Sequence, residues 1–190
     1  MLQIPYFSQL DETIEKIKKQ QACGICCVKM VLDYYLPSQK NNINDLIQEG
    51  MVIKAYNPDL LGGVWVHEGL VRILRNHGIA AYSQEFKSMK VELGGAEEEG
   101  NIARPNNEIE TSLVNFGMEK IKKCLENNEP VIVSVLPNFA KNQDSHLVII
   151  KGFENNQLIF TDPFSGDDLF FTEEHFLNFW KKLAIFTTSL

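Results

Sequence analysis

Three short apolar runs in the last third of the chain constrain its fold more than any other feature of the sequence. They cover residues 130–136, 146–150 and 157–161, and they are rich in β-branched and other apolar residues. Runs of this length and composition are typical of buried β-strands. The polar residues 154–156 fit the turn of an antiparallel hairpin, and residues 183–188 predict a final strand. The sequence therefore predicts an antiparallel sheet near its C-terminal end.

The earlier part of the chain has helical periodicity instead. Residues 23–36 place apolar side chains three and four positions apart, and Pro37 closes the segment. Apolar residues also fill much of the remaining surface, which predicts a central helix covered on more than one side. Helices before strands indicate an α+β fold in which this helix packs against the sheet. Further elements are predicted as helices over 44–49 (capped by Asn44), 66–76, 117–127 and 173–182, helical spacing within 11–21, a strand over 79–83, and an edge strand or extended arm over 2–7.

Residues 88–111 lose this periodicity. They contain Gly94-Gly95, three consecutive glutamates and Pro105 followed by two asparagines. A stretch of this length without an apolar face is typical of a lid, a binding loop or an insertion. We expect one domain over residues 1–190, with 88–111 as a mobile loop.

Length, charge and cysteine content exclude several classes of protein. The chain has 190 residues and a formal net charge of −7, which does not favour nucleic acid as a partner. No apolar run approaches the ~18 residues of a membrane span, and the N-terminus lacks the basic and apolar regions of a secretory signal. Three of the four cysteines crowd together at 23, 26 and 27, unlike a disulfide framework. We expect a cytoplasmic protein.

Cys23 is the first candidate for chemistry because it begins the predicted central helix. The partial positive charge and the unpaired N–H groups of a helix N-terminus favour a thiolate over a thiol. Gly24 beside it would let a substrate approach the backbone closely. The position of Cys23 therefore favours a reactive thiol, although an isolated cysteine at such a position is more often a small buried hydrophobe.

His146 and Asp162 are candidates for the base and its orienting group. His146 opens one apolar run and Asp162 follows the next, 16 residues later. A hairpin could bring the ends of these two strands together, so that the carboxylate holds one ring nitrogen and leaves the other to face a thiolate. Alternatively, His146 is an ordinary strand-end residue and Asp162, which precedes Pro163, belongs to a turn.

Several strings together carry a resemblance to a known family. They are Ile4-Pro-Tyr-Phe-Ser-Gln-Leu10, Ala22-Cys-Gly-Ile-Cys-Cys-Val-Lys-Met-Val-Leu32, Pro130-Val-Ile-Val-Ser-Val135, His146-Leu-Val-Ile-Ile-Lys-Gly-Phe153 and Thr161-Asp-Pro163. In this order they resemble the papain-like cysteine peptidases of the bacteriocin-processing, double-glycine-leader type, including their stand-alone relatives.

The resemblance implies a papain-like fold with Cys23 as nucleophile, His146 as general base and Asp162 as its orienting partner. It also implies that a glutamine upstream of the cysteine helps to bind the oxyanion, and Gln9 is the match. The expected reaction is hydrolysis of a peptide or amide bond in a peptide or protein substrate, with no metal or organic cofactor.

The chain departs from the family pattern in two respects. Gln9 lies 14 residues before Cys23, a longer gap than usual, with the charged stretch 11–19 between them. Gln20 and Gln21 are therefore competitors for the oxyanion role. The transporter-linked members carry membrane domains and this chain carries none, so leader-peptide cleavage does not follow from the resemblance alone.

Three other functions stay open at this point. An acyltransferase could use the same triad with an amine as acceptor. Cys23-Gly-Ile-Cys26 also has the C-x-x-C spacing of a dithiol redox protein, although the charged residues before it differ from a thioredoxin-type site. A catalytically silent papain-like domain would keep the fold without a reactive thiol. A zinc site is disfavoured because only Cys124 remains as a distant thiol, and His67 and Glu68 are expected on a helix surface.

Overall fold

The computed structural model describes residues 1–15, 17–58, 63–87, 107–140 and 145–189. The helices are the short 3-10 helix η1 (Lys19–Gln21) and the α-helices α1 (Cys23–Tyr35), α2 (Ile43–Val52), α3 (His67–Asn76), α4 (Asn107–Glu126) and α5 (Glu173–Phe179). The strands are β1 (Tyr56–Asn57), β2 (Val64–Trp65), β3 (Ile79–Glu85), β4 (Val131–Val135), β5 (His146–Glu154), β6 (Gln157–Thr161), β7 (Asp168–Thr172) and β8 (Trp180–Ser189).

Six of the strands form one sheet in the order β3-β8-β4-β5-β6-β7, and the paired neighbours run antiparallel. The four strands β4, β5, β6 and β8 match the runs predicted from the sequence. Strand β3 comes from the first half of the chain, yet it closes one edge of the sheet by pairing with β8. The predicted α+β fold, with helices first and an antiparallel sheet last, is confirmed.

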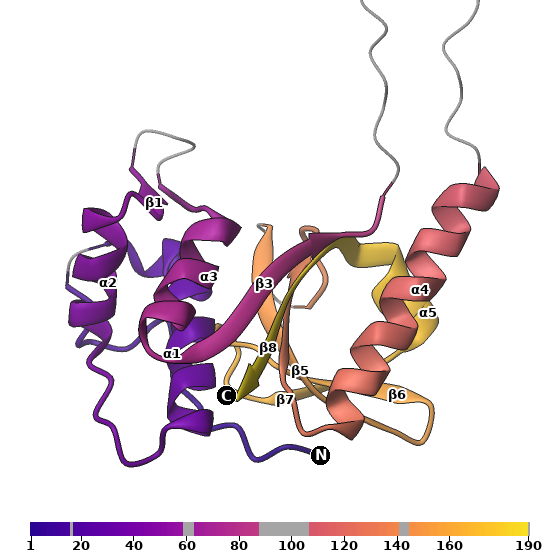
Figure 1. The fold of residues 1–190 in the computed structure, drawn as a ribbon, viewed down its shortest axis with the longest axis horizontal. Coiled ribbons are helices and arrows are strands. Elements are labelled where there is room, and N and C mark those ends of the chain that lie inside the picture. Colours follow the sequence, from indigo (N-terminus) through magenta and orange to yellow (C-terminus); the bar gives the residue numbers. More distant parts are fainter. Residues whose placement is uncertain (16, 59–62, 88–106, 141–144, 190) are drawn as a thin grey trace, which may run out of the picture.

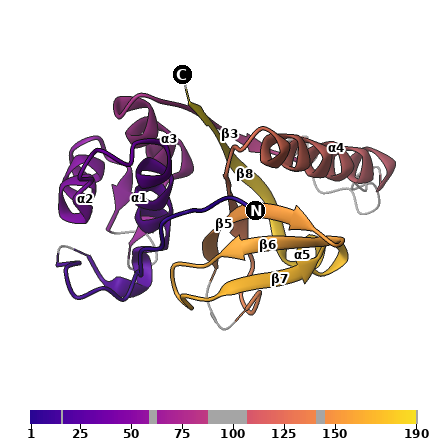
Figure 2. The same cartoon turned by 90° about the horizontal axis from the view of Figure 1, so that it is seen from below.

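Helices cover both faces of the centre of the sheet. Helices α1, α2 and α3 gather on one side, whereas α4 and α5 lie on the other (Figures 1 and 2). Side chains along the central strands alternate between the two faces of the sheet. Leu147 and Ile149 pack toward the first group of helices, whereas Val148 and Ile150 pack toward the second. The continuous apolar runs of β4 and β5 therefore reflect strands that are buried on both sides.

Helix α1 is the central helix, as its pattern predicted. Eight of its residues are buried, and it contacts β5 as well as α2 and α3. Its interior is apolar on several sides because helices and sheet surround it. The helix begins at Cys23 and ends one residue before Leu36, close to the predicted stop at Pro37. Its first turn therefore lies against the start of β5.

Several boundaries differ from the predictions. The cap of α2 is Asn42 rather than Asn44, because Asn42 accepts hydrogen bonds from the backbone N–H groups of Asn44 and Asp45. Helix α4 begins at residue 107, so the last part of the segment expected to be a loop is helical, while residues 88–106 lie outside the described part of the chain. The described residues 11–15 and 17–21 form turns, a bend and η1 rather than an α-helix.

Two strands near the C-terminus refine the picture further. Strand β7, which the sequence analysis did not predict, pairs with β6 and alternates between exposed and half-buried residues as an edge strand does. Helix α5 ends at Phe179 because the backbone becomes extended at Trp180 and enters β8.

Residues 2–7 form an arm whose Leu2 N–H donates to the Lys151 carbonyl at 2.8 Å. No helix in the described ranges has the length and apolar character that a bilayer crossing requires.

Candidate active site

Cys23 stands at the N-terminus of α1, where the helix meets the sheet. The preceding residue, Ala22, provides no side-chain cap, so the first N–H groups of the helix are not capped in this way. The Cys23 side chain is partly exposed, whereas the next residues of the helix are buried. The thiol thus combines access from outside with the favourable end of the helix dipole.

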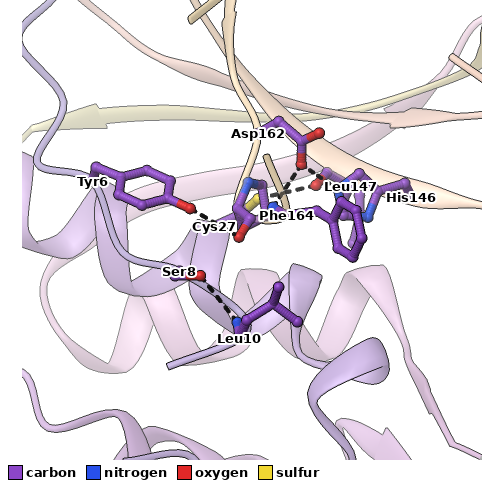
Figure 3. Close-up of polar contacts among 9 residues, drawn as sticks. Tyr6, Ser8, Leu10, Cys27, His146, Leu147, Asp162 and Phe164 are labelled. Atoms are coloured by element: carbon purple, nitrogen blue, oxygen red, sulfur yellow. Dashed lines mark hydrogen bonds and ion pairs between the residues drawn. The ribbon is translucent and has the colours of Figure 1, made fainter. Parts of the chain in front are cut away.

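His146 and Asp162 form a buried hydrogen-bonded pair. Nε2 of His146 lies 2.6 Å from Oδ1 of Asp162, and both side chains are almost fully buried (Figure 3). The backbone N–H of Phe164 donates to the same oxygen at 2.8 Å, which fixes the orientation of the carboxylate. Since Nε2 faces Asp162, the other ring nitrogen, Nδ1, is left for the thiol of Cys23.

The β5–β6 hairpin places these two residues close together. Its turn contains Asn155 and Asn156, both with positive φ, and its strands pair as the sequence predicted. Thr161 pairs with Ile149, so Asp162 lies two residues short of the position opposite His146. The Asp162 side chain reaches His146 diagonally, which is an ordinary distance for neighbours on paired strands.

The electrostatics of the pair favour a charged imidazole and a thiolate. Burial opposes the charged form of His146, but its hydrogen bonds to Asp162 and Cys23 outweigh burial and raise the pKa of His146 to about 9. Burial also opposes ionisation of Cys23, yet the hydrogen bond and charge of His146 lower the pKa of this thiol below its ordinary value. Backbone hydrogen bonds at Leu147 and Gly24 act in the same direction.

The other three cysteines have the opposite character. Cys26 and Cys27 are completely buried, and burial raises the pKa of each thiol. Burial likewise raises the pKa of Cys124 to about 11. A resolving thiol in a dithiol redox site needs access and an accessible thiolate form. Cys26 has neither property, so the structure does not favour a redox pair with Cys23.

Gln9 is buried beside the turn that follows Asp162. Its backbone N–H donates to the Pro163 carbonyl at 2.8 Å, and its side-chain Oε1 is buried without a hydrogen-bond partner. Within the long gap between Gln9 and Cys23, Nζ of Lys19 donates to the Leu10 carbonyl at 2.9 Å and so joins the two ends of the charged stretch. Gln9 therefore lies beside Pro163, the residue that follows Asp162, despite the extra residues before Cys23.

The competing glutamines occupy different surroundings. Gln20 is exposed, and Oε1 of Gln21 accepts a hydrogen bond from the Tyr56 hydroxyl at 2.6 Å. Gly63, whose φ is +123°, packs directly against both groups of this hydrogen bond, and only glycine accommodates that conformation and space. Gln21 thus connects the segment before Cys23 to the β1–β2 hairpin. Of the three glutamines, Gln9 is the one buried next to Pro163.

Two expectations about neighbouring residues change, one for Gly24 and one for His67. The space beside Gly24 is filled by side chains of the protein and is not open to a substrate. A Cβ there would lie 3.1 Å from the Cδ1 atoms of Leu70 and Leu147. Trp65 is buried and packs against the same glycine. His67 is not on an open helix surface: it is half-buried, and its Nε2 lies 2.6 Å from Oγ of Ser134 on β4.

The contact of His67 with Ser134 was missed by sequence reasoning, although one signal pointed to it. Ser134 interrupts a strand that is otherwise entirely apolar, and the structure buries its hydroxyl. A buried hydroxyl needs a hydrogen-bond partner, so a serine in such a run predicts a polar group on the element that faces it. Within the described ranges, no three His, Cys, Asp or Glu side chains gather as metal ligands would.

Comparison with known proteins relates this arrangement to a family and a fold. The sequence profile of the Peptidase_C39 like family matches residues 1–185. The peptidase domain of Streptococcus ComA, described as a bi-functional ABC transporter involved in quorum sensing, is 19% identical, with a TM-score of 0.58 and 97% of each chain covered. No curated protein sequence matches the chain.

Two further solved structures share the fold. A double glycine motif protease from an AMS/PCAT transporter, solved in complex with the leader peptide, is 18% identical, with a TM-score of 0.58, and the alignment covers 98% of this chain and 92% of that one. A protein described as a C39-like peptidase from Bacillus anthracis is 14% identical, with a TM-score of 0.63 and coverage of 99% and 96%. These similarities show that the chain has the papain-like fold of C39 peptidases.

Proposed function

The chain belongs to the Peptidase_C39 like family of cysteine peptidase-like hydrolases, and we propose that it cleaves a peptide or amide bond with Cys23, His146 and Asp162 as a catalytic triad. The observation that carries this proposal is the hydrogen-bonded chain from the thiol to the imidazole to the buried carboxylate. The lowered pKa of Cys23 and the raised pKa of His146 support a thiolate–imidazolium pair at neutral pH.

The proposed reaction begins with attack of the Cys23 thiolate on the carbonyl carbon of the substrate. The tetrahedral intermediate collapses as the imidazolium of His146 gives its Nδ1 proton to the leaving amine, which departs as a neutral amine. A water molecule then attacks the thioester while Nδ1 accepts its proton, and the second tetrahedral intermediate expels the Cys23 thiolate, which releases the acid product and restores the thiolate–imidazolium pair. Asp162 holds the ring in orientation through Nε2 in both steps.

The oxyanion of the intermediate would be bound by two donors. One is the backbone N–H of Cys23, which belongs to the uncapped first turn of α1. The other is the side-chain amide of Gln9, which is buried beside Pro163 and has a terminal atom without a partner. Rotation of that amide by a half-turn exchanges its oxygen and nitrogen, so either atom can occupy the unpaired position.

Peptides are the proposed substrates. The structure of the double glycine motif protease with its leader peptide shows that this fold accommodates a peptide chain, and the triad chemistry proposed here acts on the same kind of bond. We propose peptide or protein substrates for this chain on that basis, and no metal or organic cofactor takes part in the steps described.

The test has two readouts on the intact chain. The first is the rate of alkylation of Cys23 by iodoacetamide between pH 4 and pH 10, with the adduct located by peptide mass spectrometry. In the wild type the rate should reach half its maximum well below the ordinary thiol pKa of about 8.5. In His146→Ala the midpoint should move up to that value or above it.

The second readout is hydrolysis of a mixed pool of synthetic peptides, followed by mass spectrometry. Cys23→Ala should abolish cleavage, whereas Cys124→Ala, which removes a half-buried thiol on α4, should leave both readouts unchanged. An ordinary alkylation profile for wild-type Cys23, unaffected by His146→Ala, would overturn the proposed triad.

A further inference from the structure

Two helices make hydrogen bonds to one rung of the sheet, next to the candidate triad. Ser134 on β4 and Leu147 on β5 lie directly opposite each other, and the next rung pairs Val135 with His146. Nε2 of His67, the first residue of α3, is 2.6 Å from Oγ of Ser134. Cys27 of α1 donates its thiol hydrogen to the Leu147 carbonyl at 3.4 Å (Figure 3).

The bond between His67 and Ser134 is the shorter of the two and lies mostly out of water. Ser134 is 3% exposed, and burial lowers the pKa of His67, with the charge of Lys181 acting in the same direction. His67 is therefore a neutral imidazole at neutral pH, with one ring nitrogen committed to Ser134. Removing either partner leaves a largely buried polar group without its hydrogen bond, so the contact constrains the spacing of α3 and β4.

Packing joins the same elements beside the nucleophile. Leu70, one turn after His67 on α3, and Leu147 both approach Gly24 of α1 so closely that a Cβ there would lie 3.1 Å from each Cδ1 atom. Helix α3 therefore contacts the first turn of α1 through Leu70 and the sheet through His67. Leu147 also supplies a backbone hydrogen bond that lowers the pKa of Cys23. A shift of α3 would disturb both sides of the Cys23–His146 contact.

We propose that His67 is a positioning residue, whose hydrogen bond to Ser134 holds β4 and β5 at the spacing from α1 at which the His146 ring meets the Cys23 thiol. The inference rests on the proposed function, because it assigns His67 to the triad of that reaction. His67 itself touches no reacting atom. Its effect passes through Ser134 to the paired residue Leu147 and to the neighbouring rung that carries His146.

The experiment measures the alkylation of Cys23 by iodoacetamide against pH in the full chain. His67→Ala and Ser134→Ala should each lower the rate at pH 7 by between about threefold and tenfold and should move its midpoint upward. The double variant should be no worse than the more affected single variant, because both changes remove the same interaction. His67→Gln, which can still place a side-chain N–H near Ser134, should recover part of the rate.

Tyr35→Phe is the matched control. It removes another hydrogen bond between the helical layer and the sheet, from the Tyr35 hydroxyl to the Thr187 carbonyl at 3.2 Å, but at the far end of α1, about 18 Å from Cys23. We expect this variant to lower the melting temperature without moving the Cys23 profile. If His67→Ala and Ser134→Ala do the same, the positioning role is wrong.

Two further results separate this inference from the proposed function. If His67→Ala does not fold, Ser134→Ala carries the test, because it removes a single oxygen atom. If wild-type Cys23 alkylates as an ordinary thiol, the triad itself is overturned, and the role of His67 falls with it. A wild-type thiol of lowered pKa that is unchanged in Ser134→Ala overturns the positioning role and leaves the triad standing.

Discussion

Both faces of the sheet have apolar cores, but they differ in two respects: aromatic rings gather on one face, and the hydrogen bonds nearest the candidate triad lie on the other. On the face that packs against α1 and α3, hydrogen bonds cross from helix to sheet, such as those from Cys27 to the Leu147 carbonyl and from Tyr35 to the Thr187 carbonyl. On the face that packs against α4 and α5, aromatic rings fill the core, with centroid distances of 5.3–6.1 Å around Phe160 and Phe176.

This difference separates positioning from stability. A hydrogen bond fixes direction and distance, so contacts of that kind can hold a thiol and an imidazole in register. Packed aromatic rings bury large areas and contribute mainly to the free energy of folding. We therefore expect substitutions at the hydrogen bonds next to Cys23 and His146 to change chemistry with a small effect on stability, and substitutions in the aromatic core of the other face to do the reverse.

The largest expected effect is on the side that carries the proposed triad. His146→Ala should lower kcat/KM for peptide hydrolysis by about 10³-fold or more, because it removes both the partner of the thiolate and the proton donor. His77→Ala is the matched control, since His77 lies at the far end of α3 and bonds to Glu49. A similar loss of activity in both variants would show that the effect does not depend on the position of His146 in the proposed triad.

On the aromatic face, Phe176→Ala should cost stability instead. Phe176 is completely buried between Phe160 and Trp180, so truncation should lower the free energy of unfolding by about 3–5 kcal/mol, measured by denaturant titration. Peptide hydrolysis per folded molecule should stay close to the wild-type rate. A loss of hydrolysis in the folded fraction would show that this face also positions the site.

The pH dependence of activity should test the proposed pairing of Cys23 with His146. As pH rises, His146 loses its proton near its raised pKa of about 9, so hydrolysis should fall above that pH. As pH falls, the thiolate is protonated at the lowered pKa of Cys23, so activity should also fall on the acid side. The profile of kcat/KM should therefore be bell-shaped.

Asp162→Asn should narrow that profile from the alkaline side. The hydrogen bond that the His146 ring donates to the carboxylate raises the pKa of His146, so removing the charge should move the upper limb to lower pH, in addition to reducing the maximum rate. The measurement is the same kcat/KM profile in the variant. An unchanged upper limb would show that a group other than His146 controls the alkaline loss of activity.

The smallest effect is expected for Cys26→Ala. Cys26 is completely buried in the core on the helical face, and the proposed reaction does not use it. Hydrolysis should stay within about twofold of wild type, and the free energy of unfolding should fall by about 1 kcal/mol. Loss of all activity in this variant would instead favour the dithiol redox function.

Local patterns predicted much of this fold and the three residues of the proposed triad. The spacing of apolar residues identified α1 and the strands β4, β5 and β6, and the asparagine turn identified the β5–β6 hairpin. Once that hairpin was predicted, antiparallel pairing placed His146 and Asp162 at neighbouring strand ends, although they are 16 residues apart in the sequence. Cys23 followed from its place at the start of a helix.

Other features could not be predicted because they depend on contacts between distant segments. Asn42 caps α2 while the nearby Asn44 donates to the Thr13 carbonyl, and nothing in the local sequence distinguishes the two asparagines. The short strand β7 forms because β6 offers a free edge. Ser134 in an apolar strand indicates a polar partner on a facing element, but only the tertiary structure decides that this partner is His67, 67 positions away.

The sequence by itself determined which residues could perform chemistry and which segments would be helices or strands, because helix position, apolar periodicity and turn residues act over a few neighbouring residues. Only the tertiary structure decided which groups meet. It placed Gln9 beside Pro163 and joined Lys19 to Leu10 in the segment between Gln9 and Cys23. It also paired the Cys23 thiol with His146 and filled the space beside Gly24 with Leu70 and Leu147. These contacts depend on how the layers pack, and packing is a property of the whole chain.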